Sequence, residues 1–507
     1  MSAFDVRDLL KAAGQPETAT AGGTGHAAPL AETALPLPAK AVSPVVIAGL
    51  VRALEFGLIC ALGLSLFAAM LRGVVPFGLT YAGAVGAVAA IAVTLFQAAG
   101  TYRIAAFRAF FKTAVKLTAG WALTFLVVAA ILVLSKLADH YSRLWLAAFF
   151  AGGLGTLLVG RFALALVIGA QTRQGRFDRR TAIVGGGKIA EDLIAALETQ
   201  SDSGIRIVGV FDDRNDDRST DVVAGYPKLG NVSDLVAYAR HTRLDLIVFT
   251  IPITAEGRIL QMLSKLWVLP IDIRLSAHAT KLRLRPRAYS YLGSVPVLDV
   301  FDRPIADWDV VVKAVFDRCV GLLMLVALAP VMLAVALAVR LTSRGPVLFR
   351  QKRHGFNNEL IEVFKFRSMY VDLCDAGAAK MVTKGDPRVT PVGRFIRKSS
   401  LDELPQLFNV LKGDLSLVGP RPHALQAKAA NTLYDQVVDG YFARHKVKPG
   451  ITGWAQVNGW RGETDTSEKL QRRVEHDLYY IENWSVLLDL QILLTTPFAL
   501  LKTENAY

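Results

Sequence analysis

Four long apolar runs fill the N-terminal part of the chain and constrain its fold more than any other feature. They lie near residues 45–71, 77–99, 113–135 and 144–169. Each is long enough to cross a hydrocarbon core of about 30 Å as a helix. Hydrophobic residues make up 52% of the 507 residues, which is more than soluble proteins usually contain. We therefore expect a membrane protein.

The charges between the runs predict how the helices are oriented. Cations gather between the second and third runs and after the fourth, at Arg103, Arg108, Lys112, Lys116, Arg173, Arg176, Arg179 and Arg180. Because cationic links stay in the cytoplasm, both ends of a four-helix unit over residues 44–170 are expected there. A transporter core would need ionisable residues within its helices. The runs contain almost no ionisable residues that look buried, with Arg52 and Glu55 near the start of the first run as exceptions, so an anchor is the favoured role.

The overall charge narrows the possible partners. A formal net charge of +14 suits anionic lipid or phosphorylated ligands. The cations alternate with apolar segments, which argues against nucleic acid. Three widely spaced cysteines, Cys60, Cys319 and Cys374, indicate neither a disulfide framework nor a zinc site. Residues 1–43 are rich in Ala, Gly, Pro and Thr, and we expect a disordered cytoplasmic tail without a cleavable signal peptide.

Residues 178–300 predict a Rossmann-like α/β domain with a mostly parallel sheet. Gly185-x-Gly187-x-x-Ala190 fits the dinucleotide fingerprint, and Asp212 lies where a ribose-binding acid would stand. Many α/β domains use such glycines only for a tight turn, so a nucleotide site and a plain turn both stay open. The strand candidates are Ile205–Phe211, Leu244–Ile251 and Ile271–Leu275.

A fifth apolar run, Cys319–Val339, contains Pro330 near its middle. It would be about 31 Å long as a helix, enough to span. Proline removes a helical hydrogen bond and kinks the chain, and cations flank both ends of this run, whereas a spanning helix shows the excess on one side. We therefore expect a bent re-entrant helix over about residues 315–340. A fifth crossing is the alternative.

Two adjacent carboxylates, Asp402 and Glu403, stand in basic surroundings with Arg397 before them and Arg421 after. Ser400-x-x-Glu403 also matches a capping box, so Glu403 capping a helix is one interpretation. Capping leaves the cations unexplained. A carboxylate among cations can attack a phosphorus atom and split phosphoryl transfer into two displacements through an aspartyl-phosphate. The cations would neutralise the phosphate oxygens.

Further cations precede the acid pair. Lys365 and Arg367 occupy alternate positions of a predicted strand and would project to one face. Arginine can hold phosphate oxygens with two parallel hydrogen bonds. A solvated or lipid-facing basic strand is the plain alternative for any single cation.

Five motifs follow one another in about the last 200 residues. They are Gln351-x-Arg353-x-Gly355, Phe364-Lys365-Phe366-Arg367-Ser368-Met369, Ser400–Leu407, Gly419-Pro420-Arg421-Pro422 and Lys448–Val457. On these motifs, the chain from about Lys313 to the C-terminus resembles the bacterial sugar transferase family, the polyprenyl-phosphate hexose-1-phosphate transferases. With four preceding helices and the α/β domain, it looks like the large undecaprenyl-phosphate glucose phosphotransferase type.

The resemblance implies roles for single residues. Asp402 would take sugar 1-phosphate from a UDP-sugar, release UMP and touch Mg²⁺. Glu403 would assist as general base or metal-site partner when undecaprenyl phosphate attacks. The family commonly has Ser-Pro at the helix break, whereas this chain has Ala329-Pro330, which puts the sharpness of the bend in question. The implied phosphate-binding residues are Arg353, Lys365, Arg367, Arg397, Arg421 and Arg461.

The resemblance also implies substrate and place. The segment Asn458–Thr466 looks like the glucose-type members, which implies UDP-glucose, with galactose as the alternative. The enzyme would start exopolysaccharide or capsule assembly in the bacterial inner membrane, with its catalytic domain, residues 305–507, on the cytoplasmic face. Val474–Leu501 suits an interfacial helix, and a sixth span is its alternative. A membrane-tethered nucleotide sensor remains the alternative function, and homo-oligomers stay open.

Overall fold

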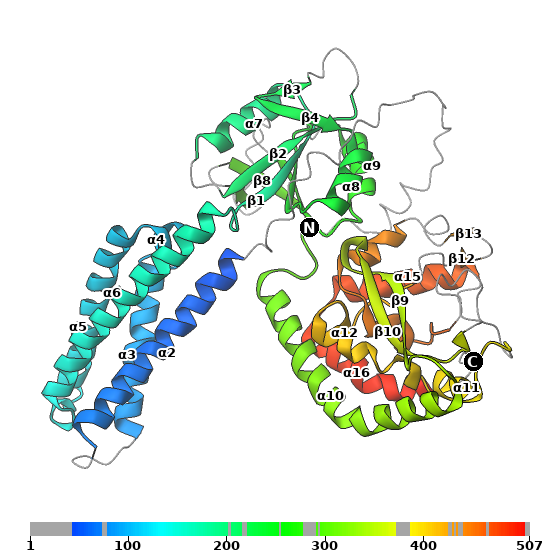
Figure 1. Ribbon diagram of the computed structural model, residues 1–507. Coiled ribbons are helices and arrows are strands. Elements are labelled where there is room, and N and C mark those ends of the chain that lie inside the picture. The colour runs from blue at the N-terminus through cyan, green and yellow to red at the C-terminus, as the bar shows by residue number, and fades with distance from the viewer. Residues whose placement is uncertain are drawn as a thin grey trace. The chain divides into compact units, whose positions relative to one another are not determined.

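A computed structural model describes most of the chain, in two compact units whose boundary along the chain lies between Arg179 and Arg180 (Figure 1). The expected tail lies outside the described residues except for Ser43, as do Cys374 and residues 463–465 of the glucose-type segment. The described residues are 43–72, 79–200, 204–214, 221–252, 255–276, 290–292, 295–371, 386–423, 428–429, 432–433, 440–462 and 466–501.

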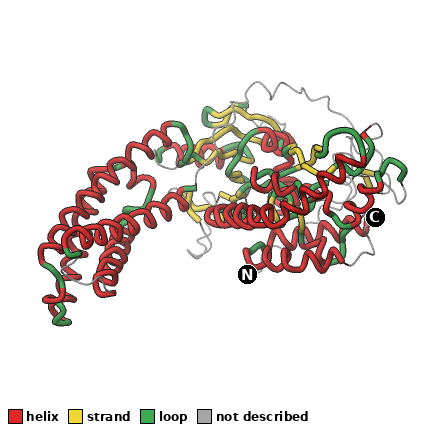
Figure 2. The backbone as a smooth tube through the Cα atoms, turned by 60° about the horizontal axis from the view of Figure 1, so that its bottom comes forward, coloured by secondary structure: helices red, strands yellow, loops and turns green. Residues whose placement is uncertain are grey.

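The first unit is helical, and strands begin only at Arg179 (Figure 2). Ser43 caps its first helix and Pro44 stands at the first helical position, where a proline costs no hydrogen bond. Five described helices, the four long ones here and α10 further on, are long and apolar enough to cross a membrane. The helices of this unit are α2 (Pro44–Met70), α3 (Leu79–Ala98), α4 (Ile104–Arg108), α5 (Phe110–Leu134), η1 (Ala138–His140) and α6 (Arg143–Arg173).

A buried ion pair joins α2 to α6 in this unit. The Arg161 Nε lies 2.5 Å from the Glu55 Oε1, and both side chains are almost wholly buried. The Tyr102 hydroxyl donates to the same carboxylate. Arg52, which the sequence singles out with Glu55, donates instead to Gln97. A charge buried this deeply requires such a partner, so the pair indicates a packing role.

Residues 180–301, called the middle domain below, form one eight-stranded sheet in the order β3-β4-β2-β1-β5-β6-β8-β7. Strands β1, β5 and β6 pair in parallel, and β8 is antiparallel to β6. Helix α7 packs on one face, and α8 and α9 pack on the other. All four residues of β5 are buried, as a central parallel strand requires. The strands are β1 (Arg179–Val184), β2 (Ile205–Phe211), β3 (Val222–Val223), β4 (Tyr226–Gly230), β5 (Leu246–Phe249), β6 (Asp272–Ser276), β7 (Ser290–Leu292) and β8 (Val295–Phe301), and the helices are α7 (Lys188–Glu198), α8 (Val232–His241) and α9 (Glu256–Leu266).

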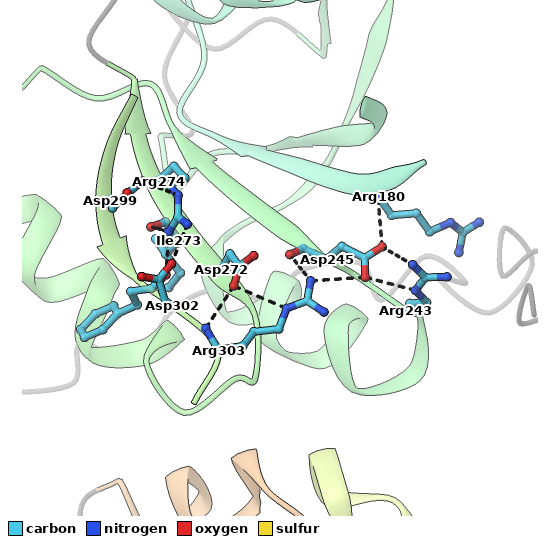
Figure 3. A network of polar contacts seen from close by, with 10 residues as sticks. Arg180, Arg243, Asp245, Asp272, Ile273, Arg274, Asp299, Asp302 and Arg303 are labelled. Atoms are coloured by element: carbon cyan, nitrogen blue, oxygen red, sulfur yellow. Dashed lines mark hydrogen bonds and ion pairs between the residues drawn. The ribbon is translucent and has the colours of Figure 1, made fainter. Parts of the chain in front are cut away.

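Arginines and aspartates cluster at the edge of the sheet where β1, β5 and β6 begin (Figure 3). Asp245 accepts hydrogen bonds from the backbone of Arg180 and from the side chains of Arg243 and Arg303. Arg303 also donates its backbone N–H to Asp272. The cluster therefore ties together the residues at which the chain enters and leaves the middle domain. We call Arg180, Arg243, Asp245, Asp272, Arg274, Asp299, Asp302 and Arg303 the edge cluster.

The C-terminal region, residues 302–501, combines helices with two-stranded sheets around two apolar clusters. Strands β9 and β10 form an antiparallel hairpin, and β11 pairs in parallel with β14. Its elements are α10 (Asp307–Thr342), β9 (Leu348–His354), η3 (Phe356–Asn358), β10 (Leu360–Phe366), α11 (Pro391–Lys398), η5 (Leu401–Glu403), α12 (Gln406–Lys412), β11 (Ser416–Val418), β12 (Lys428–Ala429), β13 (Thr432–Leu433), η6 (Tyr441–Lys446), β14 (Gly450–Thr452), α14 (Trp454–Val457), α15 (Ser467–Glu482) and α16 (Val486–Leu501).

Helix α10 is longer than expected and contains Pro330 within it. Figure 1 shows the helix bent along its length, and the missing N–H of Pro330 provides a cause. Its first half is fixed by Lys313, which donates to Asp489 and to the Val418 carbonyl. Its second half packs Val335 and the residues near it against a cluster that contains Phe366. Both halves thus contact the same folded region, while Leu323, Leu333, Leu337 and Leu341 are exposed.

The expectation of one continuous helix over Val474–Leu501 is wrong, because the structure has two helices there. Helix α15 ends at Glu482 and α16 begins at Val486. Asp489, an acid within the otherwise apolar α16, is fully buried and accepts hydrogen bonds from Lys313, Tyr480 and Trp484. A buried carboxylate needs these donors, so the acid fixes α16 to the core instead of facing headgroups.

Candidate active site

A tight turn between α11 and α12 presents the acid pair, Asp402 and Glu403. Ser400 adopts the left-handed conformation at φ 56°, and η5 follows immediately. Leu401 and Leu404 pack into the apolar cluster beneath the second half of α10. Because the two leucines anchor the turn from below, the carboxylates between them are held at a fixed position.

The capping-box interpretation of Ser400 is wrong. No side-chain cap bond forms at Ser400. Its hydroxyl instead accepts a hydrogen bond from the Arg461 guanidinium. Arg461, one of the predicted phosphate-binding residues, therefore reaches the acid pair from a distant segment of the chain.

Glu403 is clamped by two cations. The Lys365 ammonium donates to Oε1 at 2.7 Å, and the Arg421 guanidinium donates to Oε1 at 2.5 Å and to Oε2 at 3.0 Å. Burial alone would raise the pKa of Glu403, but Arg421 and Lys365 outweigh it and hold the pKa well below its ordinary value. Glu403 is therefore ionised throughout the physiological range.

Asp402 differs sharply from its neighbour. Its side chain is 8% exposed, and no hydrogen bond to its carboxylate is found among the described residues. Burial and the charge of Glu403 raise the pKa of Asp402 to about 6, against the opposing charges of Lys365, Arg397 and Arg421. Asp402 thus remains mostly ionised near neutral pH and keeps both oxygens available for a ligand.

Two of the predicted phosphate-binding arginines bind the protein itself. Arg353 donates to the Gln351 side chain and to the Pro422 carbonyl, next to Arg421. Arg367 lies just after the end of β10, is 4% exposed and donates to the backbone and hydroxyl of Ser343. Lys365 and Arg367, which are expected on one face of a strand, do not bind a common partner. Lys365 binds Glu403, whereas Arg367 holds the end of α10.

Further polar residues support the site, and the sequence does not reveal them. Arg473 donates to the carbonyls of Trp460 and Gly462 and so fixes the backbone on both sides of Arg461. Arg444 donates to the Arg421 carbonyl and to Asp477. Single charged residues carry no local signal of burial. The one available signal is the number of charged residues close together near the C-terminus of the chain.

The glycine turn of the middle domain forms a separate feature. Gly185 and Gly187 have φ values of 100° and 84°, which only glycine adopts easily. The Gly186 N–H donates to Asp212 at 2.9 Å, and Arg214 also binds this carboxylate. The three predicted residues thus lie together, with Asp212 already bound to the turn and to Arg214.

Among the described residues, no group of three or more His, Cys, Asp or Glu side chains is arranged to hold a metal ion. The acid pair offers one carboxylate, that of Asp402, because Lys365 and Arg421 occupy Glu403. Mg²⁺ commonly binds through one or two carboxylates and substrate phosphates. The donor set fits a Mg²⁺ that arrives with a diphosphate.

Comparison with known proteins gives two family matches. Residues 308–503 match the bacterial sugar transferase model, and residues 97–277 match a CoA-binding domain model. The first match contains the whole acid-pair site. The second spans part of the first unit and most of the middle domain.

Three relatives show how far the likeness extends. An undecaprenyl-phosphate glucose phosphotransferase of Komagataeibacter xylinus is 41% identical over 69% of this chain, which covers 64% of the relative, just under two thirds. A UDP-glucose:undecaprenyl-phosphate glucose-1-phosphate transferase of Escherichia coli is 36% identical over 76% of this chain and 81% of the relative. The exopolysaccharide production protein PSS of Rhizobium leguminosarum is 47% identical over 37% of this chain and 94% of the relative.

The two long relatives thus match 69% and 76% of this chain, whereas the shorter relative matches 37% of it. This chain belongs to the bacterial sugar transferase family, in its large undecaprenyl-phosphate glucose phosphotransferase type.

Proposed function

We propose that this transferase moves glucose 1-phosphate from UDP-glucose to undecaprenyl phosphate, releases UMP and so starts the assembly of an exopolysaccharide or capsule repeat unit. The observation that carries the proposal is the contrast within the acid pair. Asp402 keeps an ionised carboxylate without hydrogen bonds from the described residues, whereas Glu403 is bound by Lys365 and Arg421. Relatives with that printed activity support the choice of substrates.

The reaction proceeds in two displacements. An Asp402 oxygen attacks the phosphorus that bears glucose, an aspartyl-phosphoglucose bond forms, and the bond to UMP breaks. A phosphate oxygen of undecaprenyl phosphate then attacks the same phosphorus. This step yields undecaprenyl diphosphate glucose and frees Asp402. Lys365, Arg397, Arg421 and Arg461 lie around the acid pair and neutralise the charge that develops on the phosphoryl oxygens.

Glu403 is better suited to positioning the neighbouring cations than to acting as a general base. Its lowered pKa makes it a weak base, and the attacking oxygen of undecaprenyl phosphate is already ionised near neutral pH. The Glu403 carboxylate instead holds the Lys365 ammonium and the Arg421 guanidinium beside Asp402. Asp402 would hold Mg²⁺ together with diphosphate oxygens, and the ion would add positive charge at the phosphate.

Membrane placement is part of the proposal. A helix that crossed the bilayer would carry its ends to opposite sides, yet the residues near Lys313 and near Val335 contact one folded region. We therefore assign α10 as a re-entrant helix, and α2, α3, α5 and α6 as the transmembrane unit. In the bacterial inner membrane this arrangement keeps the acid pair on the cytoplasmic face.

An apolar groove beside the bend of α10 suits the isoprenoid chain of the acceptor. Phe366 lines it and directly follows Lys365, the ligand of Glu403. A lipid chain in this groove would have its phosphate near the cations of the site. The groove is lined by Leu325, Ala329, Met332, Leu333, Ala336, Val347, Leu348, Phe366 and Phe408.

Labelling tests the reaction. Purified enzyme mixed with UDP-glucose labelled in the sugar, without lipid acceptor, should retain about one label per active site after acid quench. Adding undecaprenyl phosphate should chase the label into lipid. A panel with UDP-galactose as competitor tests the sugar, and chelation by EDTA tests Mg²⁺. UMP release without any label on the protein would contradict the covalent step and favour direct transfer.

Topology needs its own experiment. In a chain whose native cysteines are replaced by serine, Glu359→Cys in the exposed hairpin tip should resist a membrane-impermeant thiol reagent in intact cells. Asp139→Cys, in the exposed link after α5, should react and serves as the control. Labelling at Glu359→Cys would contradict re-entry, because the site would then lie outside the cytoplasm.

The glycine turn supports a second function, nucleotide binding by the middle domain. The match to a CoA-binding domain and the left-handed conformations of Gly185 and Gly187 favour it. Titration of the full chain with fluorescent nucleotides, compared with Gly187→Val, tests this. Equal binding by both chains would place the nucleotide elsewhere.

A further inference from the structure

Arg444 contacts the backbone of Arg421, one of the cations that bind the acid pair. It is 1% exposed, and its Nη2 donates to the Arg421 carbonyl at 2.8 Å and to Asp477 Oδ2 at 2.6 Å. The side chain of the same Arg421 binds Glu403. Arg444 therefore fixes the backbone from which a site arginine projects, and Asp477 keeps Arg444 itself in place.

Arg444 belongs to η6, whose other residues contact the middle domain. The Lys446 ammonium lies 5.3 Å from the ring centroid of Trp267 and 5.7 Å from that of Phe301. The Arg240 guanidinium lies 4.6 Å from the ring centroid of Phe442. These contacts are desolvated, since burial lowers the pKa of Lys446 to about 8.

The start of η6 fits closely against the same tryptophan. Gly440 precedes the helix at φ 72°, and a Cβ there would collide with the Trp267 ring. The hairpin next to η6 adds a contact, because the Asn357 amide donates to the Ala239 carbonyl at 3.1 Å. Bonds and close packing thus run without a gap from the middle domain through η6 to Arg421.

We propose that η6 is a positioning element through which the middle domain sets the placement of Arg421, with Arg444 as the residue that transmits it. The reaction used to measure this is the proposed glucose 1-phosphate transfer. A shift of about 1 Å in a phosphate-binding group can cost up to about a hundredfold in rate.

Rapid-quench measurement of the first UMP formed separates placement from folding. The amplitude of this burst counts the sites that are correctly folded, and its rate constant reports the chemistry at each site. In the full chain, Arg444→Lys keeps a cation opposite Asp477 but loses the paired donors. We expect an unchanged amplitude and a rate constant lowered about tenfold.

Interface variants test the part played by the middle domain. Lys446→Met and Arg240→Ala should lower the burst rate constant by about two- to tenfold at unchanged amplitude. Arg206→Ala, an exposed arginine of the same domain, is the matched control and should leave both values unchanged. Lys446→Arg should restore the rate in part, because it restores a cation between the two rings.

The outcomes are distinct. A lowered amplitude with a normal rate constant in Arg444→Lys would mean that Arg444 only stabilises the fold, which overturns the proposal. Normal rate constants in both interface variants would overturn the coupling to the middle domain. If the wild-type chain shows no burst, the covalent step of the proposed function fails, and kcat corrected for the folded fraction from a fluorescence melt decides the coupling.

Discussion

In the edge cluster of the middle domain, Asp245 is bound by three arginines and Asp272 by one, and each carboxylate drawn in Figure 3 has a cationic or backbone donor. In the acid pair, Glu403 is bound in the same way, but Asp402 stands among cations without a hydrogen bond from the described residues. The residue types are the same. Complete pairing produces a structural joint, whereas one acid left unbound within an excess of cations produces a site for phosphate chemistry.

Asp402→Asn should have the largest effect on activity. An amide cannot attack phosphorus, so UMP release should fall by at least about a thousandfold while the melting temperature stays unchanged or rises. Radiometric UMP assays and a fluorescence melt provide the measurements. Residual activity of more than a few per cent would mean that another residue attacks.

Glu403→Gln should have the next largest effect. The amide releases Lys365 and Arg421 from their shared partner, so kcat should fall about ten- to a hundredfold. Glu362→Gln is the matched control, since Glu362 is half exposed and only loosely paired with Arg350. An activity loss equal to that of Asp402→Asn would assign Glu403 a direct part in bond formation.

The pH dependence sharpens the contrast between the two acids. Asp402 has its pKa raised to about 6, and the reaction needs the ionised form. Activity should therefore be full above that pKa and fall by about tenfold per unit as the pH drops below about 6. The acidic limb of the plot of kcat/KM against pH measures this fall. A limb near pH 4 would contradict the prediction, because it would mean that Asp402 of the free enzyme has an ordinary pKa.

The edge cluster should show the smallest effect on catalysis. Asp245→Asn leaves the two arginine side chains without their carboxylate and should lower the unfolding midpoint of the middle domain by a few degrees, for a loss of about 1–3 kcal/mol. UMP release at 25 °C should stay within about twofold of the wild-type rate. A large loss of activity without a change in melting would erase the distinction between the two regions.

The sequence predicts the helical runs, several strands of the middle domain and the acid pair because each depends on a local pattern. Apolar length identifies α2, α3, α5 and α6, and the family motifs place Asp402 beside cations. The partners of those cations depend on the fold. Lys365 and Arg367 are two residues apart, yet one binds Glu403 and the other Ser343.

Buried polar contacts explain the remaining differences. An interfacial helix would expose Asp489 to water, but its carboxylate accepts a hydrogen bond in the core from Lys313, 176 positions earlier in the chain. Arg161, in an otherwise apolar helix, finds Glu55 across the first unit. Such pairs join residues far apart in sequence, and the sequence around either residue does not indicate its partner. Ser400 misled for the same reason, because its hydroxyl binds Arg461 instead of a helix end.

The joint at Asp245 also bears on how such a chain could be remodelled. Arg180, where the middle domain begins, and Arg303, just after its last residue, both contact this one side chain, so the two ends of the domain lie side by side. A short loop could bridge the gap if the whole insert were deleted. Removing or exchanging the domain would therefore require little movement of the two flanking segments.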